Sequence, residues 1–195
     1  MSRGRVALVS LLIVAGAAAI LIAMGRTPIC TCGAVDLWVG ERDSSRTSQM
    51  LSDWYSFSHI VHGLLFYAAL WLVARRMPVG WRFVAALAIE SAWEVIENTP
   101  MVIDRYRTAT AALGYAGDSV VNSLSDIAMM AIGFLAARKL PLWGAILLFI
   151  ALELIPLVVI RDNLFLNIWM LLAPNDELRT WQSAAALAAW HLAGR

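Results

Sequence analysis

Charge is scarce in this sequence, and several of its long stretches contain none. Only 15% of the 195 residues are Asp, Glu, Lys or Arg, against about 25% in an ordinary soluble protein. The net charge is +1 and no Lys- and Arg-rich run exists, which excludes a basic surface for nucleic acid. Two cysteines are too few for a disulfide framework. Gly-rich phosphate loops and Gly-x-Ser-x-Gly elbows are also missing.

Apolar residues are correspondingly abundant in this sequence. Hydrophobic residues make up 61% of the chain, and a soluble domain of this length could not bury so much apolar surface. Lipid can solvate that surface instead, and the nine Trp suit a membrane interface. The composition therefore predicts an integral membrane protein whose partner is the lipid bilayer, and it identifies no protein partner.

Five apolar stretches are long enough to be transmembrane helices. The first lacks charge and extends about 29 Å as a helix, which matches the hydrocarbon core. It could be a cleaved signal peptide, but no clear cleavage site precedes Gly25, so we interpret it as a retained anchor. The predicted fold class is all-α, a single transmembrane domain over residues 1–195 whose spans are about 6–24, 55–74, 81–97, 119–137 and 142–160.

The C-terminal segment 164–195 is harder to interpret. Residues 164–173 are apolar but too few to span a bilayer, and Pro174 interrupts them. We expect a re-entrant or interfacial piece followed by an interfacial helix, and the alternative is a sixth packed span.

The distribution of charge between loops predicts the orientation. With the N-terminus in the cytoplasm, the cytoplasmic segments are 1–5, 75–82 and 138–141, which contain seven basic residues and no acid. This is the excess of Lys and Arg that cytoplasmic loops carry. We expect a multi-pass protein of the bacterial inner membrane, with loop 25–54, loop 99–118 and the C-terminus on the periplasmic side.

Ionisable residues inside the predicted spans need a partner or a function, because they are costly in lipid. Counted at ~1.5 Å per residue, they reach one layer in the outer half of the bilayer. Helical spacing also places them on single faces, for example at i and i+4 in the third span. The candidate catalytic residues are His59, His62, Glu90, Glu94 and Asp126.

Other polar residues could bind a substrate around this layer, and Arg105, Arg107 or Arg161 could pair with its surplus carboxylates. The substrate-binding candidates are Glu97, Asn98, Asp104, Arg105, Arg107, Asp118, Asn122, Glu153, Arg161, Asp162 and Asn163. Cys30 and Cys32 could form a thiol pair, clip a metal or stay unpaired, and a bridge across one residue would be strained.

Several kinds of chemistry fit the polar layer. No cofactor follows from the sequence, although a divalent metal such as zinc could bind His59, His62, Glu94 and Asp126 and activate water. Without a metal, two carboxylates could act as acid and base. The leading hypothesis is a site open to the periplasm that acts on a lipid or envelope precursor by hydrolysis. The alternatives are a non-enzymatic envelope or assembly protein held by a polar network, and a cation- or proton-linked transporter.

Several short motifs resemble a bacterial uncharacterised-protein family of small multi-pass inner-membrane proteins, a domain of unknown function. The resemblance covers residues 25 to about 182, and Phe165 departs from it. The motifs are Gly25-Arg26-Thr27-Pro28-Ile29-Cys30, Asp53-Trp54-Tyr55, Ser58-His59-Ile60-Val61-His62-Gly63, Trp93-Glu94, Glu97-Asn98, Ile103-Asp104-Arg105-Tyr106-Arg107, Gly117-Asp118-Ser119-Val120-Val121-Asn122-Ser123, Asp126 and Arg161-Asp162-Asn163. The resemblance implies a multi-pass inner-membrane protein and no activity. A fainter resemblance links the order of His, acidic span and Asp/Asn-rich helix to VanZ-like proteins.

Overall fold

The structure, a computed structural model, describes residues 3–112 and 114–193, and the side chains of residues 185–193 are outside the description. These residues form eight helices and no strand, which confirms the predicted all-α fold class. The helices are α1 (Arg3–Ala23), α2 (Ser56–Val73), α3 (Val79–Glu97), α4 (Pro100–Ala109), α5 (Val120–Lys139), α6 (Leu142–Ile160), α7 (Leu164–Leu172) and α8 (Asp176–Ala193).

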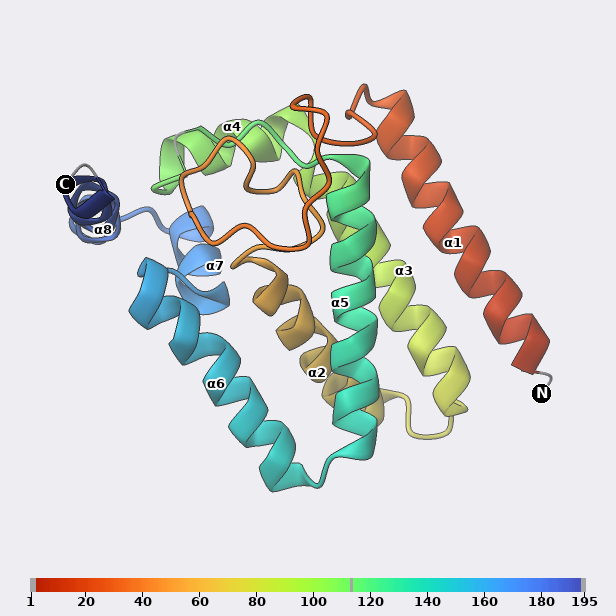
Figure 1. Ribbon diagram of the computed structural model, residues 1–195. Helices are drawn as coiled ribbons and strands as arrows, with labels where there is room; N and C mark the ends of the chain where they lie inside the picture. Colours follow the sequence, from red (N-terminus) through yellow and green to blue (C-terminus); the bar gives the residue numbers. More distant parts are fainter. Residues whose placement is uncertain (1–2, 113, 194–195) are drawn as a thin grey trace.

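Five of these helices, α1, α2, α3, α5 and α6, run side by side along the long direction of the molecule (Figure 1). They occupy the five apolar stretches of the sequence. Among the described residues, α1, α2, α5 and α6 are long and apolar enough to cross a membrane. Helix α3 is of similar length but carries Arg82 and three Glu. It packs against α1, α2 and α5, so that five spans remain our prediction.

The two ends of the bundle differ in charge and covering. The α2–α3 and α5–α6 connections lie at the same end as the N-terminus (Figure 1). Arg75 and Arg76 belong to the first connection, and Arg138 and Lys139 end α5 beside the second. At the opposite end, α4 and loop 24–55 lie across the helices (Figure 1). This arrangement agrees with the alternating topology that the sequence predicts.

Helices α2 and α5 approach each other closely because glycines meet at their crossing. A Cβ atom on Gly63 would lie 2.1 Å from the Met130 carbonyl oxygen, and one on Gly133 would lie 2.0 Å from the Ile60 carbonyl oxygen. The buried residues Met130 and Phe134 of α5 pack beside this crossing with residues of α1 and α3. The close approach fixes the polar residues of α2 and α5 that lie nearer the covered end.

The covered end contains a helix within the predicted loop 99–118 and a bond between the two cysteines. Residues 100–109 form helix α4, which begins with Pro100 at a position where its missing N–H costs nothing. Cys30 and Cys32 are joined by a disulfide bond.

The C-terminal segment contains two helices that differ in direction from the bundle. Helix α7 has nine residues and begins at the Asn163 cap, whose side chain accepts a hydrogen bond from the Leu166 backbone N–H. Helix α8 is seen end-on where the bundle helices run up and down (Figure 1). An interfacial position for α8 stays a prediction, and residues 194–195 of the predicted segment lie outside the described residues.

Candidate functional site

His59 is the centre of a buried cluster between α2, α3 and α5. Its Nδ1 lies 2.6 Å from Oε1 of Glu90 and 3.4 Å from Oε1 of Glu94. Its Nε2 lies 3.8 Å from Oδ2 of Asp126. The four catalytic candidates named here therefore do come together, because the i, i+4 spacing of Glu90 and Glu94 turns both toward α2.

His62 is held by the same glutamate. Its Nδ1 lies 3.1 Å from each carboxylate oxygen of Glu90, and its ring stacks on Phe66 with centroids 5.7 Å apart. Glu90 is fully buried, whereas the His62 side chain is 16% exposed. With Nδ1 paired to Glu90, the Nε2 atom of His62 is left for a substrate or water.

Asp126 is positioned by the start of α2. The Ser56 hydroxyl donates a hydrogen bond of 3.0 Å to Oδ1 of Asp126. Asp53, which is also buried, accepts hydrogen bonds from the backbone N–H groups of Ser48 and Tyr55, and this holds the entry to α2. Ser56, His59 and Gly63 share one face of α2, so that the glycine crossing also aligns the polar groups.

An inner cavity of about 490 Å³ opens beside the cluster. His59, His62, Glu90 and Asp126 line it together with apolar side chains and with further polar ones, among them Ser58, Tyr106 and Asn167. Glu97 and Asp118 are two further sequence candidates on its wall. The apolar part consists of Leu65, Phe66, Ile89, Trp93, Leu164, Ile168, Leu171 and Leu172.

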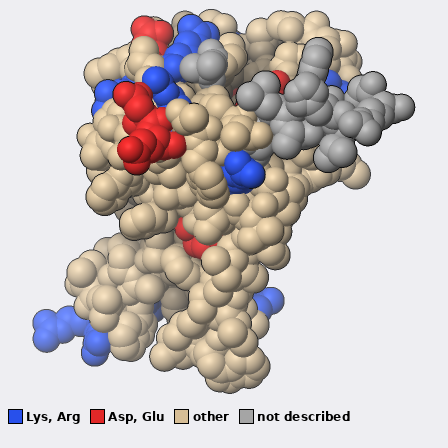
Figure 2. Space-filling view, turned by 90° about the vertical axis from the view of Figure 1, so that its left-hand side faces the viewer, with Lys and Arg blue, Asp and Glu red and all other residues tan. Residues whose placement is uncertain are grey.

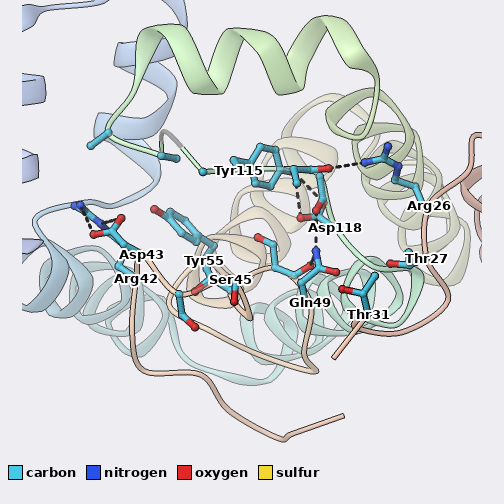
Figure 3. A pocket seen from close by; sticks show the side chains of 18 of the residues that line it. Arg26, Thr27, Thr31, Arg42, Asp43, Ser45, Gln49, Tyr55, Tyr115 and Asp118 are labelled. Atoms are coloured by element: carbon cyan, nitrogen blue, oxygen red, sulfur yellow. Dashed lines mark hydrogen bonds and ion pairs between the residues drawn. The ribbon is translucent and has the colours of Figure 1, made fainter. Parts of the chain in front are cut away.

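An outer chamber of about 800 Å³ lies between loop 24–55 and the segment that follows α4, and many of its lining residues carry polar groups (Figure 3). Its walls contain the guanidinium groups of Arg26 and Arg42 and many hydroxyl groups. Ser48, Tyr55, Ala112, Tyr115 and Asp118 line both spaces, and the two are therefore adjacent. The hydroxyl-bearing residues of this lining, apart from the shared ones, are Thr27, Thr31, Ser44, Ser45, Thr47 and Ser183.

Asp118 sits where the two spaces meet. Its carboxylate accepts a hydrogen bond from Asn98 Nδ2 at 2.7 Å. It also accepts from the Tyr115 hydroxyl at 3.0 and 3.1 Å (Figure 3). Burial raises the pKa of Asp118 from 3.8 to about 6, against the opposing effect of these hydrogen bonds. Asn122 is buried behind it and donates to the Met50 carbonyl, so Asn98 and Asn122 act in holding the walls.

The remaining substrate-binding candidates are not brought to the cluster. Glu153 of α6 accepts a hydrogen bond from the Phe165 backbone N–H. Asp162 accepts from Tyr55 and Gln182, and Asn163 caps α7. Exposed Asp104 lies 3.9 Å from Arg107. None of these side chains lines the inner cavity.

The predicted arginine partners were wrong. Among the described residues, no Arg lies within 4.0 Å of the cluster carboxylates. Arg105 donates instead to the Leu171 carbonyl, Arg107 to the Tyr115 carbonyl and Arg161 to the Trp181 carbonyl. The reason is that α4 lies across the end of the bundle, where its arginines reach nearby backbone rather than the interior (Figure 1).

Sequence reasoning missed several residues of the site. Ser56 precedes His59 by three positions, a helical spacing that could have revealed it. Tyr55 and Tyr115 separate the two spaces, and Trp93 and Asn167 line the inner cavity. Nothing in the sequence pattern distinguishes these aromatic residues from ordinary interface anchors.

Comparison with known proteins identifies the family. Residues 21–184 match the family model described as a protein of unknown function (DUF2585). The chain belongs to this family. A UPF0314 protein of Paracoccus denitrificans (strain Pd 1222) is 51% identical over 173 residues, which cover 89% of this chain and 90% of the relative. A UPF0314 protein of Sphingopyxis alaskensis is 52% identical over 180 residues, covering 90% and 94%.

The resemblance to an uncharacterised bacterial family is thus confirmed. These comparisons add nothing to the fainter likeness to VanZ-like proteins. No solved structure matches the chain.

Proposed function

We propose that this member of the DUF2585 family is a multi-pass protein of the bacterial inner membrane that hydrolyses an amphiphile of the envelope. One observation carries the proposal: a single cavity is lined both by the imidazole and carboxylate groups of the cluster and by eight large apolar side chains. An amphiphile with a hydrolysable bond near its polar group matches this mixed lining.

The rim of the inner cavity supports entry from the bilayer. Leu65, Ile89, Ile168 and Leu172 line the cavity and are also 45–79% exposed. On the side where α6 and α7 lie, the surface is hollowed between two apolar lobes (Figure 2). Such a face lets an acyl or prenyl chain slide in sideways while its polar group reaches the acids. The volume is within the range of about 300–1,000 Å³ for small-molecule sites.

The outer chamber supports two parts of the proposal, the orientation of the protein in the membrane and a large polar headgroup on the substrate. Its hydroxyls and the Arg26 guanidinium suit a phosphate or sugar headgroup on the periplasmic side, whereas the Arg42 guanidinium is already paired with Asp43. The basic loops at the opposite end of the bundle then face the cytoplasm, as the positive-inside rule requires.

The Glu90–His62 pair supplies the acid–base chemistry of the proposal. Glu90 holds Nδ1 of His62 at 3.1 Å, and Nε2 of His62 accepts a proton from water. The hydroxide oxygen bonds to a carbonyl carbon or phosphorus of the substrate. The bond from that atom to the leaving oxygen breaks, and this oxygen takes the proton back from His62. Water is the only co-reactant.

Incubation of the purified full-length protein with envelope lipids of Paracoccus denitrificans in ¹⁸O-water tests the proposal. We expect mass spectrometry to show ¹⁸O in one class of product. His62→Gln should lower its rate by about 10²–10⁴-fold with little change in melting temperature. Exposed Glu41 gives the control Glu41→Gln, which should keep the wild-type rate.

Two outcomes would contradict hydrolysis. One is the absence of any ¹⁸O-labelled product, lipid or water-soluble. The other is an unchanged rate in His62→Gln. A large loss of melting temperature in His62→Gln, with no product from wild type, would favour the alternative of a structural polar network.

A further inference from the structure

We infer that His59, Glu94 and Asp126 form a binding site for one divalent first-row metal ion, of the zinc or manganese class. The three residues come from α2, α3 and α5, and each offers one ligand atom within 4.8 Å of the other two. All three are buried, with Glu94 1% and Asp126 5% exposed. The site goes beyond the proposed hydrolysis and does not depend on it.

The first evidence is an unpartnered atom of Glu94. Among the described residues, no hydrogen-bond partner reaches Oε1 of Glu94, although the atom is fully buried. Nδ1 of His59 lies 3.4 Å from this atom, but it already contacts Glu90 at 2.6 Å. A buried carboxylate oxygen without a partner is costly, and it is aimed into the cluster where a cation would satisfy it.

The second evidence is the surplus of carboxylates. Glu90, Glu94 and Asp126 surround His59, and the part of the chain that the structure describes places no Lys or Arg within 4.0 Å of them. The arginines expected to offset this surplus bind backbone carbonyls elsewhere. A divalent cation supplies the missing positive charge at the point where the carboxylates converge.

The third evidence is how neighbouring groups orient the ligands. The contact between His59 Nδ1 and Glu90 leaves Nε2 directed toward Asp126. Ser56 donates to Oδ1 of Asp126, which leaves Oδ2 at 3.8 Å from that Nε2. Metal-binding histidines usually donate their other ring N–H to a carboxylate, and this is the place of Glu90. Glu90 is therefore a positioning residue for His59.

The donor set indicates the metal and its accessibility. One imidazole nitrogen and two carboxylate oxygens suit zinc or manganese. Two ligands of a tetrahedral zinc lie about 3.3 Å apart for bonds of about 2.0 Å. The observed 3.8 Å between His59 Nε2 and Asp126 Oδ2 is close to that separation. His59 and Asp126 also line the inner cavity, so a fourth position can face it and hold water.

The test uses the full-length protein in detergent after treatment with a chelator. The protein is titrated separately with Zn²⁺ and with Mn²⁺. We expect wild type to bind one equivalent of at least one of these two ions. Glu94→Gln and Asp126→Asn should weaken that binding by more than 100-fold, and Glu90→Gln by about 10–100-fold. Glu41→Gln makes the same chemical change on an exposed carboxylate and should bind like wild type.

Two results would overturn the site. One is that neither ion binds stoichiometrically to wild-type protein, although a sharp thermal transition shows that this protein is still folded. The other is unchanged binding in folded Glu94→Gln, which would place the ion elsewhere. Binding without any lipid product would refute the proposed hydrolysis and leave the metal site standing.

Discussion

Asp118 shows at the scale of one residue what burial does in this chain. Its pKa of about 6 means that the folded protein holds the proton more tightly than the unfolded chain, where the value is near 3.8. The stability that this difference contributes is fully present below about pH 4 and is lost as the pH rises through 6. Two pKa units correspond to about 3 kcal/mol.

Asp118→Asn tests this dependence. The variant keeps an oxygen that can accept a hydrogen bond from Asn98 and removes the ionisation. We expect the melting temperature in detergent to fall less between pH 4.5 and 7.5 in Asp118→Asn than in wild type. Equal pH slopes in the two proteins would show that Asp118 ionises without cost, contrary to its burial.

Residue positions on helices could be predicted from the sequence, but their long-range partners could not. The spacing of Glu90 and Glu94 and their depth relative to His59 and Asp126 correctly brought these four together. The predicted pairing of Arg105 with a carboxylate was wrong, because the direction of its side chain depends on how α4 lies across the bundle. Such an arrangement is set by tertiary packing, which leaves no period in the sequence.

At the scale of elements, the crossing of α2 and α5 places the site. Gly63 directly follows His62, and Gly133 lies two turns from Asp126 on the same face of α5. Long apolar runs and flanking charges predicted the five long helices, because helix length and charge are local properties. The glycine contact was not predicted, since it requires knowing which faces meet.

Substitution of either glycine should separate the helices. In Gly63→Ala and Gly133→Ala the new Cβ would collide with backbone atoms of the partner helix. We expect each to lower stability by about 1–3 kcal/mol or more and to weaken Zn²⁺ or Mn²⁺ binding. Gly16→Ala is the matched control, because a Cβ there meets nothing within 4 Å. Wild-type melting and metal affinity in both crossing variants would show that the helices adjust without disturbing the site.

For the molecule as a whole, the charged ends, the apolar sides and the two adjoining spaces are the features on which the proposed binding of an amphiphile rests. The outer chamber lies at the covered end, and several residues that line the inner cavity are also exposed on the outside of the bundle. The sequence indicated a layer of ionisable groups. The sequence could not show that some apolar residues line a cavity, because Leu and Ile are expected in a transmembrane helix whether they face lipid or a cavity.

Native mass spectrometry of the protein released from nanodiscs made with bacterial envelope lipids tests most directly whether the inner cavity holds an amphiphile. We expect wild type to retain one amphiphile, and Ile168→Trp and Leu171→Trp to lose it because the larger ring fills the cavity. Val158→Trp, on an exposed position of α6 outside the cavity, should retain it. Identical bound lipids in all four proteins would contradict an amphiphile in this cavity.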